Sequence, residues 1–252
     1  KRLIGGAPHR RCMSDSRGRA MSVTLLMLMS IFTALLTTTS ATVISTNTTW
    51  SGEVSIDDNI QIMSGKTLTI EEGTNITVTG DYIITVDGSV VIDGLQSKPV
   101  TITNNNNPGG LNSNTGWWDG FLVTATGNID ASWLEISRGR RSFEVAGSVT
   151  LDNVTVDNSF FGADVSGSAS VTDFNCQNID FTCLSVLSGA TVSANTVSVS
   201  GSSYGVENGG SLTLDGLQVS QSGFAVVIYD GASGSGQNIG IDNSTIAVTS
   251  RD

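Results

Sequence analysis

The densest cluster of basic side chains is the segment EISRGRRSFE, which contains Arg138, Arg140 and Arg141. A guanidinium group presents its N–H donors as a planar fork, so it can hold a carboxylate or a sulfate through two parallel hydrogen bonds. The segment therefore predicts a clamp for an acidic ligand. The alternative is a solvated turn whose positive charges offset an acidic neighbourhood, and the sequence leaves both readings open.

A second group with chemical potential is aromatic. Trp117 and Trp118 are adjacent in GWWDGF, directly after the polar run NNNNPGGLNSNT. Aromatic rings have large apolar faces with a preferred stacking geometry, so the pair can form either a platform for a sugar or a structural plug. Position in the repeat described below favours a structural role for Trp118 and Phe121. Trp117, together with the loop 104–115, is the predicted place for a sugar contact.

Four aspartates are predicted at the same corner of the repeat described below: Asp152, Asp173, Asp215 and Asp242. If they form a column with neighbouring carboxylates one rung apart, like charges repel unless a cation such as Ca²⁺ lies between them. Aspartate is also a common turn residue, and water screens carboxylates at exposed corners. A calcium site is one interpretation and a set of solvated turns is the other. No other cofactor is expected.

Composition excludes several other chemistries. The one histidine, His9, lies in a segment that is predicted to be absent from the mature chain, so no Ser-His-Asp or Cys-His set is available. No zinc-ligand spacing and no phosphate-binding glycine loop occurs. Cys176 and Cys183 form either a disulfide or two buried thiols, because sequence does not give the separation of their Cα atoms.

The chain begins with a predicted leader, residues 1–41. Two arginines precede an uncharged apolar run from 23 to 36, and small residues follow up to Ala41, which is the pattern of a secretory signal peptide. The run is short for a bilayer span, so a cleaved signal is favoured over an uncleaved anchor. The first methionines come later, so residues 1–12 are expected to be untranslated. The predicted location is outside the cell or on its surface.

The charge of the chain restricts its partners. The formal net charge is −11, and the first twenty residues hold six of the twelve basic residues and one of the twenty-three acidic ones, which leaves −16 on the rest. Such an acidic surface repels nucleic acid and anionic lipid, so neither is an expected partner. Membrane contact is expected only through an uncleaved leader or a C-terminal anchor beyond this sequence. Candidate glycosylation sites are Asn47, Asn75, Asn153 and Asn243.

A repeat carries these residues. The segments GSVVIDG, GSVTLDN, GSASVTD and GSLTLDG align with one another. With further copies, the first residues of the repeats, here called anchors, fall at 66, 88, 127, 147, 167, 190, 210 and 237. The spacing is mostly 20 to 23 residues, with one large insertion between 88 and 127. Such a period is typical of a solenoid.

Each repeat contains three short runs in which apolar and polar residues alternate, which is the pattern of β-strands. Only two residues separate the second run from the third, as in Asp93-Gly94, Asp152-Asn153, Asp215-Gly216 and Asp242-Asn243. So tight a corner needs a residue that tolerates positive φ. Coils stacked about 4.8 Å apart pair each strand with its counterpart in the next coil. The sequence predicts an all-β fold, a right-handed parallel β-helix with three short strands per coil.

The predicted β-helix is a single domain over residues 42–252. Its last repeat stops in the middle of a strand, without the polar cap that protects the end of a solenoid. We therefore expect the sequence to be truncated at its C-terminus. A helical repeat is disfavoured because helical periodicity is nearly absent.

Residues 50–121 also resemble a known family. The steps WSGEVSI, SGKTLTIEEGTNITVTG, YIITVDGSVVIDG, KPVTITN and GWWDGF occur in the order of the opening coils of secreted β-helix proteins of the pectate-lyase-like superfamily. The resemblance implies the fold and says little about activity, because this superfamily includes polysaccharide lyases, hydrolases, adhesins and surface proteins. For a hydrolase it implies an aspartate cluster assisted by a histidine. For a lyase it implies a Lys or Arg base opposite an acidic, calcium-holding patch.

Two functions follow as expectations. The leading one is a non-enzymatic structural or adhesive module, secreted or on the cell surface, with polysaccharides or cell-surface glycans as its partners. The alternative is a polysaccharide lyase or glycoside hydrolase. An enzyme should show an open groove in which Asp and Arg or Lys side chains converge. A structural module should show Ser, Thr and Asn without such convergence.

Overall fold

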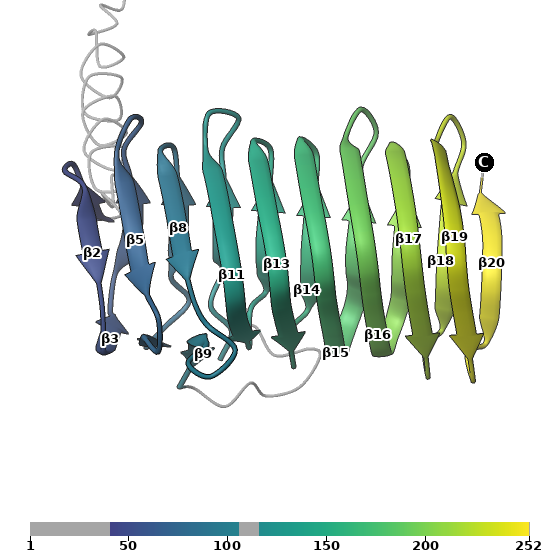
Figure 1. The fold of residues 1–252 in the computed structure, drawn as a ribbon, viewed down its shortest axis with the longest axis horizontal. Coiled ribbons are helices and arrows are strands. Elements are labelled where there is room, and N and C mark those ends of the chain that lie inside the picture. The colour runs from purple at the N-terminus through teal and green to yellow at the C-terminus, as the bar shows by residue number, and fades with distance from the viewer. Residues whose placement is uncertain (1–40, 106–115, 252) are drawn as a thin grey trace, which may run out of the picture. The chain divides into compact units, whose positions relative to one another are not determined.

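The computed structural model describes residues 41–105 and 116–251. Every regular element in these residues is a β-strand, and strands of neighbouring coils pair in parallel. Figure 1 shows the strands stacked coil after coil from β2 to β20. The predicted all-β fold, a parallel β-helix, is confirmed. Within the described residues no helix is long and apolar enough to cross a membrane.

Each coil has three faces, here called A, B and C. Face A consists of β1 (Ala41–Ile44), β4 (Asn59–Ile62), β7 (Ile83–Val86), β10 (Gly120–Val123), β12 (Arg141–Val145), β14 (Phe161–Val165), the last parts of β15 (Ser168–Val186) and β16 (Thr191–Asn208), β18 (Phe224–Tyr229) and β20 (Ile246–Arg251). Face B begins with β2 (Thr48–Trp50), β5 (Thr67–Glu71) and β8 (Ser89–Asp93). Face C begins with β3 (Glu53–Ile56), β6 (Asn75–Val78) and β9 (Val100–Asn104).

From the fourth coil onward one long strand supplies both face B and face C. These strands are β11 (Asn128–Ser137), β13 (Ser148–Asp157), β15, β16, β17 (Ser211–Ser220) and β19 (Ser233–Asp242). Alternate side chains point inward, so Val90, Ile129 and Val149 lie in register on successive coils and are all buried. The core is a set of such apolar columns, which explains why the period-two pattern is visible in the sequence.

The predicted repeat register is correct for seven of its eight anchors. The residues that follow anchors 66, 88, 127, 147, 167, 190 and 210 all lie in one column of face B. A Cβ atom on Gly147 would lie 2.2 Å from the carbonyl oxygen of Gly127. Glycine at this anchor is therefore required by the close approach of the neighbouring coil.

The eighth anchor, at 237, is wrong. Ser211 pairs with Ser233, so the last repeat begins at Ala232 and keeps the regular spacing. The inward positions of this repeat are Gly234 and Gly236, where the preceding coil has leucines. The apolar pair that marks an anchor is therefore missing there, and the nearest such pair, Ile239 and Ile241, lies on face C.

A residue with positive φ forms the corner between faces B and C. These residues are Trp133, Asn153, Asp173, Thr196, Gly216 and Asn238, with φ between 50° and 80°. The predicted left-handed corner is confirmed from Trp133 onward. The earlier pair Asp93-Gly94 is an exception, because residues 94–99 form a longer connection between β8 and β9.

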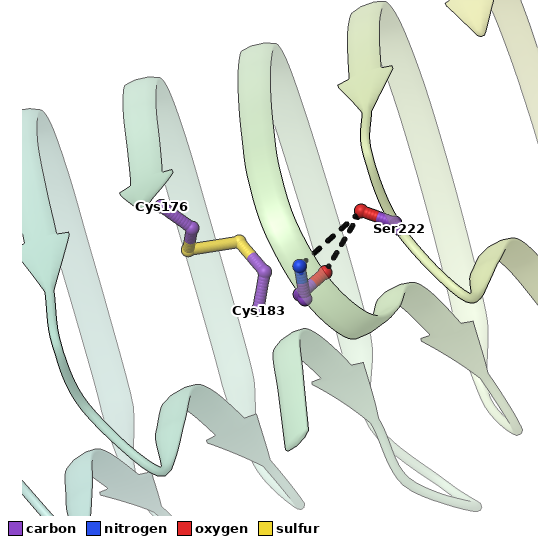
Figure 2. Close-up of a disulfide and its surroundings, with 4 residues drawn as sticks. Cys176, Cys183 and Ser222 are labelled. Atoms are coloured by element: carbon purple, nitrogen blue, oxygen red, sulfur yellow. Dashed lines mark hydrogen bonds between the residues drawn. A yellow bond between two sulfur atoms is a disulfide. The ribbon is translucent and has the colours of Figure 1, made fainter. Parts of the chain in front are cut away.

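The corner between faces C and A also contains a residue with positive φ, which sequence reasoning missed. These residues are Arg138, Asn158, Asn178, Gly201, Gln221 and Asn243, with φ between 45° and 72°. Serine often follows: the Oγ atoms of Ser159 and Ser222 accept hydrogen bonds from backbone N–H groups of the preceding coil. Figure 2 shows Ser222 in this contact.

A disulfide joins Cys176 on face C to Cys183 on face A, with Cα atoms 5.8 Å apart (Figure 2). Of the two alternatives for these cysteines, the bridge is the one that forms, and both residues are fully buried. The preceding coil makes room for it with Gly162, where a Cβ atom would lie 3.0 Å from Cys176 Sγ and 2.3 Å from the carbonyl oxygen of Cys183.

Replacing Cys176 and Cys183 together with alanine is expected to lower the free energy of unfolding by about 2–3 kcal/mol, because the bridge closes a short loop in the unfolded chain. Urea denaturation of the variant and of the oxidised wild-type protein measures the difference. As a control, a thiol reagent should label neither cysteine in the folded wild-type protein and both after reduction in urea. Equal stability of the two proteins would contradict the expected role.

Candidate functional site

A groove of about 510 Å³ lies on the outer side of face A. Its walls come from strands β14, β15, β16, β18 and β20, and they include the aromatic side chains of Phe161, Phe181, Tyr204 and Tyr229. Charged groups line the same groove: Asp164, Glu207, Asp230 and Arg251. Aromatic surface and a few polar groups therefore converge in one hollow, as is typical of ligand sites.

The aromatic side chains form a ladder along face A. Ring centroids are 5.0 Å apart for Phe161 and Phe181, 5.2 Å for Phe181 and Tyr204, and 5.0 Å for Tyr204 and Phe224. The spacing follows from the distance between parallel strands, about 4.8 Å. Phe181 is the most exposed of these rings, at 38%.

Two arginines lie over the outer rings of the ladder. The Cζ atom of Arg141 is 5.5 Å from the centroid of Phe161, and that of Arg251 is 4.9 Å from the centroid of Phe224. Such cation–π contacts hold the guanidinium groups against the rings. Arg251 also lies 5.5 Å from the centroid of Tyr204. The arginines thus partly cover Phe161, Tyr204 and Phe224, which leaves Phe181 as the ring surface that is best placed for a ligand.

The carboxylate of Glu207 is held in place inside the groove. One of its oxygens accepts a hydrogen bond from Thr182 Oγ1 and the other accepts one from Tyr229 Oη. The hydrogen bond to Glu207, together with partial burial, raises the pKa of Tyr229 above its ordinary value. Tyr229 therefore stays protonated at neutral pH and keeps donating to the carboxylate.

Asp164 contributes a polar atom that the protein leaves unpaired. Its Oδ1 atom is buried and has no hydrogen-bond partner among the described residues. A buried oxygen without a donor is costly, so such an atom is a natural acceptor for a ligand hydroxyl. Asp164 occupies the same column of face A as Ser185 and Glu207, two rungs before Glu207.

The predicted tryptophan platform is largely buried. Trp118 is 0% exposed, its Nε1 atom donates to the carbonyl oxygen of Ser137 at 3.1 Å, and its ring packs edge-on against Phe121 at 5.6 Å. Trp117 is 7% exposed. A ring without exposed surface presents no face to a sugar, so Trp118 is a structural residue. Residues 106–115 of the loop that was grouped with Trp117 lie outside the described residues, as do residues 1–40 of the predicted leader.

The three arginines of the predicted clamp have separate protein partners. Arg140 forms an ion pair with Asp119 at 2.8 Å, and Arg141 forms one with Glu144 at 2.9 Å. Arg138 forms a corner and donates to the carbonyl oxygen of Asn104 at 3.0 Å. Burial raises the pKa of Asp119, and Arg140 opposes that shift.

The four aspartates do not form one column. Asp152 and Asp215 share a column of face B, with Thr172 and Asn195 on the two rungs between them. Asp173 is one residue further along, in the positive-φ corner. Asp242 lies at the end of face C. It was expected at the B–C corner only because the eighth anchor was placed at 237 and not at 232. No group of three or more His, Cys, Asp or Glu side chains in the described residues is arranged to hold a metal ion.

The candidate glycosylation sites lie at different places on the coil. Asn47 and Asn243 are exposed, and Asn153 is half-buried. Asn75 is exposed, but its side chain donates to Glu53 at 2.7 Å and accepts from Thr101 at 2.8 Å. Asn153 and Asn243 were expected at the same corner. Asn153 lies at the B–C corner and Asn243 at the C–A corner. The expectation was wrong for Asn243 because it rested on the misplaced anchor at 237.

Sequence reasoning missed the groove on face A, although a signal was present. Phe161, Phe181, Tyr204 and Phe224 each lie fourteen residues after one of the anchors at 147, 167, 190 and 210. An aromatic residue at one fixed place in four successive repeats predicts an aromatic column. Comparison of the chain with models of known families, with curated proteins and with solved structures finds no match.

Proposed function

We propose that the protein is a non-catalytic glycan-binding module of the cell exterior, and that glycan chains bind in the groove of face A. The observation that carries the proposal is the convergence of Phe181, Tyr204, Glu207 and Asp164 in that groove. Sugar rings have apolar C–H faces that pack on aromatic rings, and their hydroxyls donate to carboxylates. The groove extends over several coils, so its shape suits a chain of sugars.

Two further observations support an extracellular module. The disulfide between Cys176 and Cys183 is of a kind that persists in oxidising compartments and is rare in the cytosol. The leader predicted in residues 1–41 agrees with export. The ordered steps of residues 50–121, whose described residues fold as coils of a parallel β-helix, support membership in the pectate-lyase-like superfamily.

Replacing Phe181 with alanine is expected to weaken glycan binding by about tenfold or more. An aromatic ring that becomes buried when a ligand binds contributes on the order of 1–2 kcal/mol. Affinity electrophoresis in gels that contain a panel of plant, fungal and bacterial polysaccharides measures the effect. Phe160→Ala is the matched control. Phe160 stacks on Phe181 at 5.9 Å but does not line the groove, so this variant should retain binding. Equal losses in the two variants would show that the ladder only supports the fold.

The alternative function, a polysaccharide lyase or glycoside hydrolase, is favoured by one specific feature. Asp164, Glu207 and Asp230 share the groove with Arg251, which is the convergence of acidic and basic groups that an enzyme requires. Incubation of the protein with the polysaccharides that it binds, followed by analysis of reducing ends and unsaturated products, separates the two functions. Product that disappears in Glu207→Gln would establish the enzyme.

A further inference from the structure

Trp133 occupies a backbone conformation that disfavours a bulky residue. Its φ is 51°, in the left-handed region, where a large side chain is a genuine outlier. The other residues at this B–C corner are smaller: Asn153, Asp173, Thr196, Gly216 and Asn238. The turn therefore does not require tryptophan. A strained residue that the fold does not need is a reason to look for a function at that position.

Trp133 lines a hollow of about 260 Å³ on the outer side of face C. The remaining wall consists of Gln96 and Pro99 from the connection between β8 and β9, and of Glu135, Thr155, Asp173 and Asn175, among others. This connection lies close to the backbone of Trp133. A Cβ atom on Gly94 would be 2.3 Å from the carbonyl oxygen of Trp133. The backbone of this connection therefore packs directly against the backbone of Trp133.

The polar side chains of the hollow are available to a ligand. Within the described residues, no hydrogen bond to another protein group is seen for the side chains of Glu135, Thr155 or Asn175. A carboxylate, a hydroxyl and an amide beside an indole ring offer both donors and acceptors next to an apolar face. Among the described residues, the charged groups that line the hollow, Glu135 and Asp173, are both acidic, and no basic side chain lines it.

We infer that this hollow is a second binding site, distinct from the groove of face A, and that it binds a neutral glycan. The indole ring of Trp133 packs on the sugar ring, and Asn175 and Glu135 bind its hydroxyls. Uronic acids and sulfated sugars are excluded by the two carboxylates. A second hollow of about 220 Å³ shares Asn175 and extends along face C past Gln177, Ser200 and Gln218, so neighbouring sugar units have polar side chains to contact.

The test is titration of the full chain with hexamers of β-1,4-linked glucose, β-1,4-linked mannose and galacturonate, monitored by tryptophan fluorescence. We expect a saturable change with at least one neutral hexamer and none with the galacturonate hexamer. In Trp133→Asn, the fluorescence change should disappear and calorimetric affinity should fall at least about tenfold. Asparagine tolerates positive φ, so the Tm of this variant should stay within about 2 °C of the wild-type value or exceed it.

Three results would overturn the inference. One is the absence of a fluorescence response to both neutral hexamers. Another is a response that persists in Trp133→Asn. The third is a Tm of Trp133→Asn more than about 4 °C below that of the wild type, which would make the ring a structural residue. The variant Phe181→Ala separates the two sites, because it should lose binding in the groove of face A and keep the Trp133 response.

Discussion

Replacing Gly120 with alanine is expected to lower the free energy of unfolding by about 3–5 kcal/mol, because overpacking against backbone adds to the cost of a left-handed residue. Gly120 has a φ of 90°, and a Cβ atom there would lie 1.6 Å from the carbonyl oxygen of Arg141 on the next coil. The oxygen belongs to the backbone of β12, so the collision cannot be relieved by a side-chain rotation. Urea denaturation measures the loss.

Gly65→Ala is the matched control for this prediction. Gly65 has a φ of 72°, yet no atom of the described residues lies within 4 Å of the position that its Cβ atom would occupy. Its replacement should cost only the backbone term, on the order of 1 kcal/mol. Similar losses in Gly120→Ala and Gly65→Ala would mean that the coils can separate, which would contradict the tight stacking described above.

Trp118→Ala is expected to cost about 3–5 kcal/mol, the usual range for removal of a large buried aromatic side chain. Trp118 is fully buried, packs against Phe121 at 5.6 Å and donates to the carbonyl oxygen of Ser137. Its removal leaves a cavity next to the column in which Phe121 stacks on Phe143 at 5.7 Å. Thermal or urea unfolding of the purified variant provides the measurement.

The adjacent tryptophan provides the comparison. Trp117 is 7% exposed and is not part of the apolar core cluster, so Trp117→Ala should cost clearly less than Trp118→Ala. Trp118→Phe should recover part of the loss, because it restores apolar volume without the hydrogen bond to Ser137. A larger effect for Trp117→Ala would contradict the assignment of Trp118 as the structural residue.

Much of the fold could be predicted because every coil has to meet the same physical requirements. Inward positions must be apolar on every rung, and the approach of Gly147 to the backbone of Gly127 demands glycine at that anchor. Asn153 and Gly216 marked the B–C corner because few residue types accept positive φ. The prediction failed in the last coil. There Gly234 and Gly236 occupy the inward positions that leucines hold in the preceding coil, so the alternation of apolar and polar residues is lost.

The C–A corner was harder to predict. Arg138 and Gln221 adopt positive φ there although neither residue type is a usual choice for it. The Oγ atom of Ser159 accepts the N–H group of Gly139, so a contact between coils satisfies the backbone at this corner. Such a contact joins residues on adjacent rungs, which are about one repeat apart in the sequence.

The candidate site was mostly missed for a related reason. Arg138, Arg140 and Arg141 are close neighbours in the sequence, yet their guanidinium groups have separate partners. In a solenoid, residues about one repeat apart lie side by side, so Phe181 and Tyr204 meet although they are distant in the chain. Trp133 could have been recognised, because it lies six residues after the anchor at 127, the place that Asn153 and Gly216 occupy in their own repeats.

The most direct test of the proposed function measures binding and turnover together. The full chain is incubated with immobilised polysaccharides, and both the retained protein and the length distribution of the recovered glycan are determined. We predict that at least one polysaccharide retains the wild-type protein, that Phe181→Ala is released more readily than Phe160→Ala, and that glycan length is unchanged. The absence of retention on every polysaccharide, or a shortened glycan, would contradict a non-catalytic glycan-binding module.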